Sequence, residues 1–313
     1  MAAWKILLTD GLEENGQSIM REKATVVDRT GISADELLQV IGEYDALIVR
    51  GRTKVTAAVL DAGKNLKVVG RAGVGVDNID LKAAKEHKVT VVNSPYATTV
   101  AVAELTLGLM LSLLRDIPRA DAGMKNGKWL KKELEGAEMY NKTLGIVGFG
   151  RIGQAVAKRA AAFDMRIVAF DPIRPTEEVC QQGCEPLSLD EMLAQSDIIS
   201  IHTPLTADTR AMLGPDQFFK MRDGVYLVDA ARGGVVDEAS LLSALNSGKV
   251  AGAALDVFTT EPPGQTELAC HPRVICTPHI GAQTVEAQQR AAYDIGTEIM
   301  RALGGEDLRW RVA

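Results

Sequence analysis

Short apolar runs rich in β-branched residues alternate along the chain with stretches of helical periodicity. In the first third, the predicted strands are residues 5–9, 46–50, 67–70 and 89–93. A long apolar helix is predicted over residues 100–116, and six more strands follow it at residues 144–148, 166–170, 198–202, 225–230, 251–257 and 274–277. This alternation predicts parallel sheets joined by helical crossovers, and six strands is the count of a doubly wound sheet.

The order of these elements predicts two domains, one nested in the other. The last predicted helix, residues 284–303, has no strand after it, so we expect it to pack back on the first domain. The predicted fold is α/β: a doubly wound parallel-sheet (Rossmann) domain of residues 97–282 lies within a smaller, discontinuous, flavodoxin-like α/β domain of residues 1–96 and 283–313.

Composition narrows the class of protein. A length of 313 residues fits two domains, and 46% hydrophobic with 24% charged residues is typical of an ordinary globular protein. The net charge of -6 argues against a nucleic-acid partner. Residues 100–114 contain Glu104 and are too few to span a bilayer, so we predict a buried helix and no membrane partner.

Four cysteines match no zinc spacing, so we expect inert thiols in a reducing cytoplasm and no metal site. They are Cys180, Cys184, Cys270 and Cys276.

A glycine-rich loop follows the predicted strand that ends at Val147. The pattern Gly148-x-Gly150-x-x-Gly153 is weak evidence alone, but here it leaves a strand and opens a helix over residues 154–163. In a dinucleotide site the first glycine makes the tight turn, the second admits the pyrophosphate, and the third lets helix and strand pack closely. The helix N-terminus then faces the phosphates.

The next strand, residues 166–170, runs into Asp171. A carboxylate there accepts hydrogen bonds from the adenosine ribose and repels a 2′-phosphate, so NAD is favoured over NADP. The alternative is a solvated turn aspartate before Pro172. Arg174, three residues later, leaves the strictness of the NAD preference open.

Three side chains at predicted strand ends suit the oxidation of a 2-hydroxy acid. His279 follows the last strand and is our candidate acid/base, and Glu261 would hold its ring and stabilise its charged form. Arg232, between small residues, would bind the substrate carboxylate through a bidentate guanidinium. The alternatives are a loop histidine, a capping glutamate and a rim arginine. His202 is more consistent with shaping the cofactor loop than with chemistry.

The sequence resembles the D-isomer-specific 2-hydroxyacid dehydrogenase family, and within it the enzymes that oxidise D-3-phosphoglycerate. The segments that carry the resemblance are residues 49–50, 54–56, 70–73, 75–78, 103–105, 127–129, 148–153, 231–234, 256–258 and 278–282. The resemblance implies that Arg232, Glu261 and His279 are the catalytic residues. With the loop above, it predicts cofactor contacts at Gly148, Gly150, Arg151, Ile152, Gly153, Asp171, His202, Thr203, Pro204, Ala230, Ala231, Asp256, Gly281 and Ala282.

Two segments of the first domain are candidates for holding the substrate. A turn after the third predicted strand would offer backbone N–H groups to the carboxylate, and comprises Arg71, Ala72, Gly73 and Val74. Many relatives have threonine where this chain has Val74. A basic cluster would hold a phosphate, unless it is simply a solvated loop, and comprises Arg50, Arg52 and Lys54.

We therefore expect NAD-dependent oxidation of D-3-phosphoglycerate to 3-phosphohydroxypyruvate, the entry to serine biosynthesis, with the substrate bound between the domains. A glyoxylate or hydroxypyruvate reductase, or a D-lactate dehydrogenase, would keep the catalytic residues without needing the basic cluster. An NAD-sensing corepressor-like protein is the alternative from another class. The chain ends without the C-terminal regulatory domain of longer relatives, so we expect no serine inhibition through such a domain. The apolar segments 100–114 and 123–130 and the resemblance suggest a homodimer.

Overall fold

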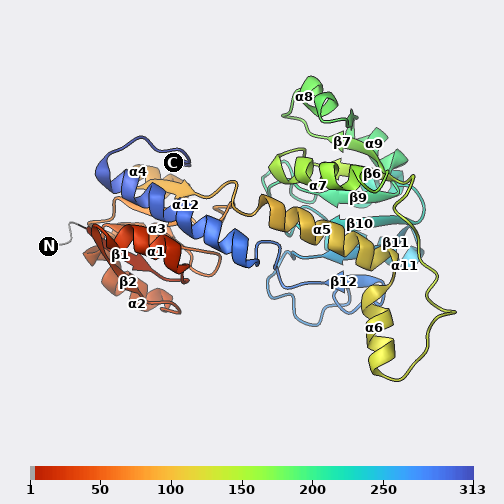
Figure 1. Cartoon of the computed structure of the whole chain (residues 1–313), viewed down its shortest axis with the longest axis horizontal. Helices are drawn as coiled ribbons and strands as arrows, with labels where there is room; N and C mark the ends of the chain where they lie inside the picture. The colour runs from red at the N-terminus through yellow and green to blue at the C-terminus, as the bar shows by residue number, and fades with distance from the viewer. Residues whose placement is uncertain (1–3) are drawn as a thin grey trace. The chain divides into compact units, whose positions relative to one another are not determined.

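The computed structural model describes residues 4–313, and the chain divides into two compact units (Figure 1). The first unit runs to Thr98 and resumes over Ala282–Ala313, and the second is Thr99–Gly281. The sequence placed these divisions after residue 96 and after residue 282.

The first unit contains a five-stranded parallel sheet with the strand order β2-β1-β3-β4-β5. The strands are β1 (Trp4–Leu8), β2 (Ala24–Asp28), β3 (Ala46–Val49), β4 (Val68–Arg71) and β5 (Thr90–Asn93). This is the flavodoxin-like order. Only four of these strands were predicted. The missed strand β2 lies at the sheet edge and is only partly buried, so its apolar signal is weak.

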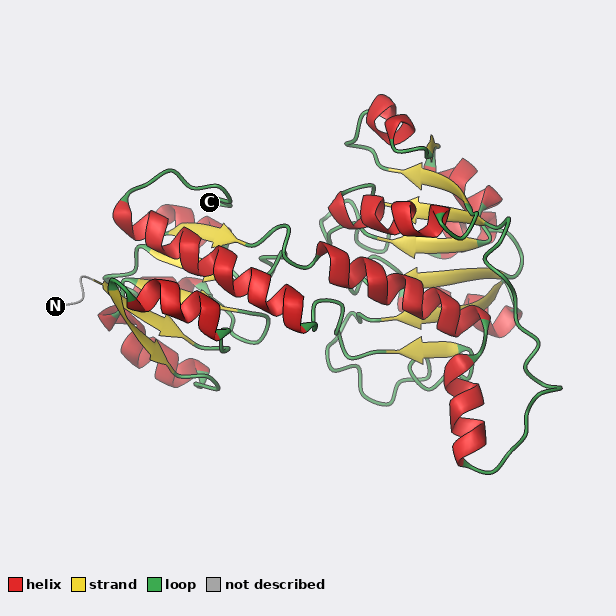
Figure 2. Cartoon of the chain, viewed as in Figure 1, coloured by secondary structure: helices red, strands yellow, loops and turns green. Residues whose placement is uncertain are grey.

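Helices cover both faces of this sheet (Figure 2). They are α1 (Glu14–Arg21), α2 (Ala34–Val40), α3 (Ala57–Ala62), α4 (Leu81–Glu86) and α12 (Val285–Gly304), with the short 3-10 helix η1 (Ile41–Glu43). Successive residues of a strand point to opposite faces, so Leu7 packs in the core under α2, α3 and α4, whereas Ile6 packs under α1 and α12. The last predicted helix therefore does return to the first domain's sheet, where Ile295 and Ile299 are fully buried.

The second unit contains a seven-stranded parallel sheet with the order β12-β11-β10-β9-β6-β7-β8. The strands are β6 (Thr143–Val147), β7 (Arg166–Phe170), β8 (Glu185–Pro186), β9 (Ile198–Ile201), β10 (Val225–Asp229), β11 (Val250–Leu255) and β12 (Val274–Cys276). Six were predicted; the seventh, β8, is a two-residue edge strand too short to show a period. The strand order reverses between β6 and β9, and ligands of doubly wound sheets bind outside the carboxyl ends of the strands at such a point.

Helices also lie on both faces of the second sheet (Figure 2). The helices of this unit are α5 (Thr99–Leu114), α6 (Ile117–Lys125), α7 (Arg151–Ala161), α8 (Thr176–Gln181), α9 (Leu189–Gln195), α10 (Pro215–Lys220) and α11 (Glu238–Ser247). The long apolar helix α5 is a core helix: Met110 is fully buried and packs with residues of α7 and the sheet. Across residues 4–313, we find no helix with the length and apolar content needed to cross a membrane.

Candidate active site

The glycine loop connects β6 to α7 at the switch point of the second sheet. Gly148 has φ +90°, a left-handed conformation that favours glycine, and a Cβ there would lie 2.8 Å from the carbonyl oxygen of His202. A Cβ on Gly153 would collide with the carbonyl oxygen of Gly148, which fixes how closely helix and loop approach. Gly150 differs, because a Cβ there would meet nothing within 4 Å. The loop is thus tightly packed at Gly148 and Gly153 and open at Gly150, where a pyrophosphate would approach.

Asp171 holds the glycine loop through hydrogen bonds that the sequence did not predict. Its Oδ2 accepts the backbone N–H of Phe149 at 2.8 Å, and its Oδ1 accepts the N–H groups of Ile173 and Arg174 at 2.9 and 3.1 Å. The carboxylate therefore ties the glycine loop to the turn after β7. It also lines a hollow of about 290 Å³ at the turn after β7. Arg174 lines the same hollow, while its guanidinium forms an ion pair with Glu178 at 2.9 Å.

His202 lies directly after β9, beside the glycine loop. Its Nε2 shares a 2.8 Å hydrogen bond with the hydroxyl of Ser200, whereas its Nδ1 is buried without a partner among the described residues. Burial lowers the pKa of His202 to about 3, so the ring is neutral at physiological pH. The open Gly150 position, the hollow beside Asp171 and this orphaned nitrogen fit a bound dinucleotide, which the loop, Asp171 and the turn at His202 would hold.

Glu261 and His279 form a contact at the carboxyl edge of the same sheet. His279 Nδ1 lies 2.8 Å from Glu261 Oε2, and Glu261 Oε1 accepts the backbone N–H of Phe258 at 3.1 Å. Both side chains are partly exposed, and His279 has a left-handed backbone, φ +53°. The carboxylate holds the proton on Nδ1, which leaves Nε2 available to exchange a proton with a substrate.

Arg232 follows β10, the strand next to β11. Its guanidinium Nη1 donates to the carbonyl of Ala231 at 2.7 Å. The next residue, Gly233, packs so closely on the loop after β11 that a Cβ would collide with the carbonyl of Phe258. Because that loop carries Glu261, the second unit brings the arginine turn beside the Glu261 and His279 pair.

Asp256, predicted as a cofactor contact, anchors the loop that carries His279. It is 1% exposed, and its Oδ1 accepts the hydroxyl of Thr277 at 2.6 Å and the N–H of Ile280 at 2.8 Å. Its Oδ2 accepts the N–H of Gly281 at 2.8 Å. These hydrogen bonds fix the backbone after the histidine and hold the side chain of Thr277 before it.

Asp229, at the end of β10, was not predicted. It is 2% exposed, and its Oδ1 accepts the N–H of Ala231 at 2.9 Å. Burial raises the pKa of Asp229 to about 7. A signal was present in the sequence, since an acidic residue lies at the end of the apolar strand, three positions before Arg232.

The basic cluster of the first unit is largely engaged by that unit's own acids. Arg50 forms an ion pair with Glu13 at 2.6 Å. Arg52 lies 3.2 Å from Asp10, and its guanidinium also donates to two backbone carbonyls. Lys54 is exposed. The sequence could place the three cations together but could not show which carboxylates the fold brings to them.

The turn after β4 offers fewer amides than predicted. The N–H of Ala72 is taken by the carbonyl of Val49 at 2.9 Å, so this residue has no amide left for a substrate. Arg71 folds over the turn and donates to the carbonyl of Ala72 at 2.9 Å, and a Cβ on Gly73 would collide with its guanidinium. Asn93 holds the carbonyl of Val74 at 2.6 Å. The amides of Gly73 and Val74 are the ones that stay candidates.

Comparison with known proteins places these features in a family. The NAD-binding domain of the D-isomer specific 2-hydroxyacid dehydrogenases matches residues 107–281. A hydroxypyruvate reductase of Thermotoga maritima is 46% identical over 308 residues, covering 97% of this chain and 100% of the relative. A D-3-phosphoglycerate dehydrogenase of Methanocaldococcus jannaschii is 47% identical over 303 residues, covering 96% of this chain and 58% of the relative. The chain therefore spans little more than half the length of that relative.

Solved structures give the same result. A glyoxylate reductase from Paecilomyes thermophila superposes with a TM-score of 0.92 at 32% identity, covering 100% of this chain and 99% of that one. A D-lactate dehydrogenase from Aquifex aeolicus, solved with NAD and lactic acid, superposes with a TM-score of 0.84 at 30% identity, covering 96% of each chain.

Proposed function

Because this chain belongs to the D-isomer specific 2-hydroxyacid dehydrogenase family and uses NAD, we propose that it interconverts D-3-phosphoglycerate and 3-phosphohydroxypyruvate, a step of serine biosynthesis. The observation that best supports this choice of substrate is the sequence identity of 44–47% to D-3-phosphoglycerate dehydrogenases over nearly the whole of this chain. Within the basic cluster, the exposed side chain of Lys54 supports a phosphorylated substrate, whereas Arg50 and Arg52 pair with Glu13 and Asp10.

The residues of the second unit divide the reaction among them. Arg232 holds the substrate carboxylate, and His279 takes the hydroxyl proton on Nε2 while Glu261 stabilises the imidazolium through Nδ1. The glycine loop and Asp171 would hold NAD, which would supply the acceptor for the hydride of C2. In the reverse direction the protonated ring of His279 returns its proton to the carbonyl oxygen.

Substitution of the histidine tests these roles. His279→Gln should lower kcat by about 10²–10⁴-fold, the usual contribution of a general acid/base. NADH affinity, measured by fluorescence titration, should stay near the wild-type value, because the glycine loop and Asp171 are unchanged. A variant with full turnover would refute the assignment.

The phosphate assignment is tested at Lys54. Lys54→Gln should raise KM for 3-phosphohydroxypyruvate about tenfold, the loss of one charge-assisted contact, and leave KM for hydroxypyruvate unchanged. Lys64→Gln is the matched control, since Lys64 is another exposed lysine of the same unit. Equal effects on both substrates, or none on either, would count against a phosphate site there.

A second candidate, hydroxypyruvate or glyoxylate reduction, has its own support. Arg50 and Arg52 already pair with Glu13 and Asp10, and the hydroxypyruvate reductase relative is covered over its full length. Steady-state NADH oxidation with 3-phosphohydroxypyruvate, hydroxypyruvate, glyoxylate and pyruvate decides the matter. A higher kcat/KM for hydroxypyruvate than for its phosphate would select this second function.

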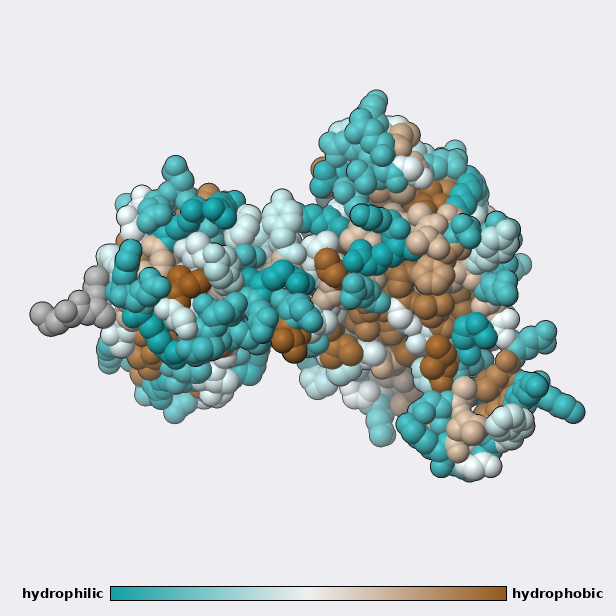
Figure 3. Space-filling view, in the orientation of Figure 1, coloured by the Kyte–Doolittle hydropathy of each residue, from teal (hydrophilic) through white to brown (hydrophobic). Residues whose placement is uncertain are grey.

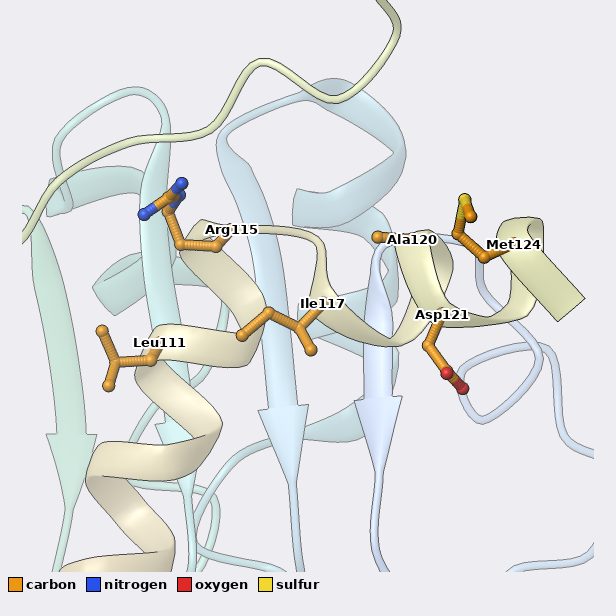
Figure 4. A pocket seen from close by; sticks show the side chains of 6 residues that line it. All are labelled: Leu111, Arg115, Ile117, Ala120, Asp121 and Met124. Carbon is orange, nitrogen blue, oxygen red and sulfur yellow. The ribbon is translucent and has the colours of Figure 1, made fainter. Parts of the chain in front are cut away.

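The same proposal includes a homodimer. Of the two apolar segments that the sequence offered, helix α5 is mostly buried in its own unit, so residues 123–130 and the adjoining helix α6 are the better candidate surface. Ile117 and Met124 of α6 are about half exposed, and Trp129 is more so. In Figure 3 the apolar surface of this unit extends over the area of α5 and α7 as far as α6. A hollow of about 470 Å³ lies at the junction of α5 and α6, and Ile117 and Met124 are among the residues that line it (Figure 4).

A second copy of this chain is the occupant we propose for this surface, because homo-oligomers usually bury such patches. Light scattering should give the mass of a dimer for the wild type and of a monomer for Ile117→Glu. A monomeric wild type would refute the proposed dimer.

We also place the enzyme in the reducing cytoplasm, which agrees with its free cysteines.

A further inference from the structure

Two buried carboxylates lie side by side at the ends of β10 and β11. Asp229 and Asp256 are 2% and 1% exposed, and the N–H of Asp256 donates to the carbonyl of Asp229 at 2.8 Å. The proposed chemistry assigns Asp256 to the loop of His279 but leaves Asp229 without a role. Burying two acids together is costly, so a buried pair of this kind calls for an explanation.

The contacts of Asp229 point to the arginine turn. Its carboxylate accepts the N–H groups of Ala231 and Arg232, and so it fixes the backbone from which the arginine side chain starts. The Arg232 guanidinium is the cation that acts on it from this turn, and Asp256 is the like charge that acts from β11. On the other side β9 leads into His202, whose ring is neutral.

These charges make the protonation of Asp229 sensitive to what binds Arg232. Burial is the largest influence on the pKa of Asp229, which lies at about 7. The N–H of Ala231 and the N–H and charge of Arg232 act to lower this pKa, and the charge of Asp256 acts to raise it. An anion that neutralises the guanidinium cancels that lowering influence. The carboxyl group then favours its neutral form more strongly than before.

We propose that Asp229 positions Arg232 and takes up a proton from solvent when the carboxylate of a 2-oxo acid binds to that arginine. The inference rests on the role that the proposed function gives to Arg232. By linkage, a site that takes up a proton on binding loses affinity as the pH rises, by at most about tenfold per pH unit for one proton. Asp229 thereby couples substrate affinity to pH independently of His279.

Oxamate, a non-reacting analogue of pyruvate, provides the test. Its Kd on the enzyme with NADH bound is measured from pH 6 to 9 in His279→Gln, a background that removes the proton taken up by the histidine. We expect the Kd to rise about tenfold across this range. In His279→Gln with Asp229→Asn, the amide oxygen can still accept the N–H of Ala231 while the charge is gone, so the Kd should be low and independent of pH.

A matched control and a second readout keep the outcome clear. Asp223→Asn, at an exposed ion pair with Lys249, should leave the slope of the His279→Gln background unchanged. Without the histidine variant, Asp229→Asn alone should lower KM for the 2-oxo acid several-fold at pH 8.5 relative to wild type and have little effect at pH 6. A flat Kd in His279→Gln, or a slope that survives Asp229→Asn, would overturn the inference.

Failure of the inference and failure of the proposed function look different. If wild-type enzyme reduces none of the 2-oxo acids and does not bind oxamate, the function assigned to Arg232 is wrong. If it turns over and binds oxamate, but Asp229→Asn leaves every pH dependence unchanged, only the role of Asp229 is wrong.

Discussion

Asp256→Asn separates two roles for the buried carboxylate next to the histidine loop. As an anchor, Asp256 accepts hydrogen bonds from Thr277, Ile280 and Gly281 at 2.6–2.8 Å. In the Asp256→Asn variant the amide oxygen can still serve the first two, but the NH₂ group then faces the N–H of Gly281. The variant loses one hydrogen bond to a charged acceptor and leaves a buried donor unpaired, which together cost about 3 kcal/mol.

Urea unfolding of the full chain, followed by circular dichroism, measures this cost. The chain has two units, so the transition of the second unit is the one that should shift. Asp223→Asn, at an exposed ion pair, is the control and should not move it. We also expect kcat to fall about 10²-fold, because a displacement of His279 of about 1 Å suffices for this. Unchanged stability and kcat with weaker NADH binding would show that Asp256 is a cofactor contact and no anchor.

Two further substitutions test the loop and the packing of the last helix. Gly153→Ala places a Cβ against the carbonyl of Gly148. We expect about 1–3 kcal/mol of destabilisation and at least tenfold weaker NADH binding, measured by fluorescence titration. Wild-type affinity would show that the loop tolerates the shift. Burial, and then the charge of Glu298, raise the pKa of Asp294 to about 6. The stabilising contribution of the neutral Asp294 side chain is therefore fully present below about pH 4 and is lost as the pH rises through 6. Asp294→Asn should therefore raise Tm at pH 8 but not at pH 4, and an equal change at both values would contradict this.

Most of the fold was predictable because both sheets are parallel and buried on both faces. Strands such as β3 and β9 are then continuous apolar runs, which a sequence shows directly. The two missed strands, β2 and β8, lie at sheet edges, where one side needs no partner and the apolar signal fades. Whether such a short segment forms an edge strand depends on the strand it pairs with, and that pairing is determined by the tertiary structure.

The candidate site was predictable to the extent that residue type and strand end define it. Arg232, Glu261 and His279 follow strands that parallel topology brings to one edge, so their proximity followed from the order of the elements. The role of Asp171 in holding the glycine loop did not follow from the sequence, because the partner of its carboxylate is a backbone amide, which every residue has. For the same reason the engagement of Ala72 could not be foreseen.

The basic cluster shows why substrate choice is harder to predict than chemistry. Asp10 accepts the N–H of Arg50 and both the N–H and the hydroxyl of Thr53, so its carboxylate is held in place beside the guanidinium of Arg52. A phosphate cannot displace so well-anchored an acid without leaving several donors unpaired. It would have to bind on the outer side of the cluster, where Lys54 is exposed. The residue that best reports on a phosphorylated substrate is therefore the lysine, although the two arginines are the more usual ligands of phosphate.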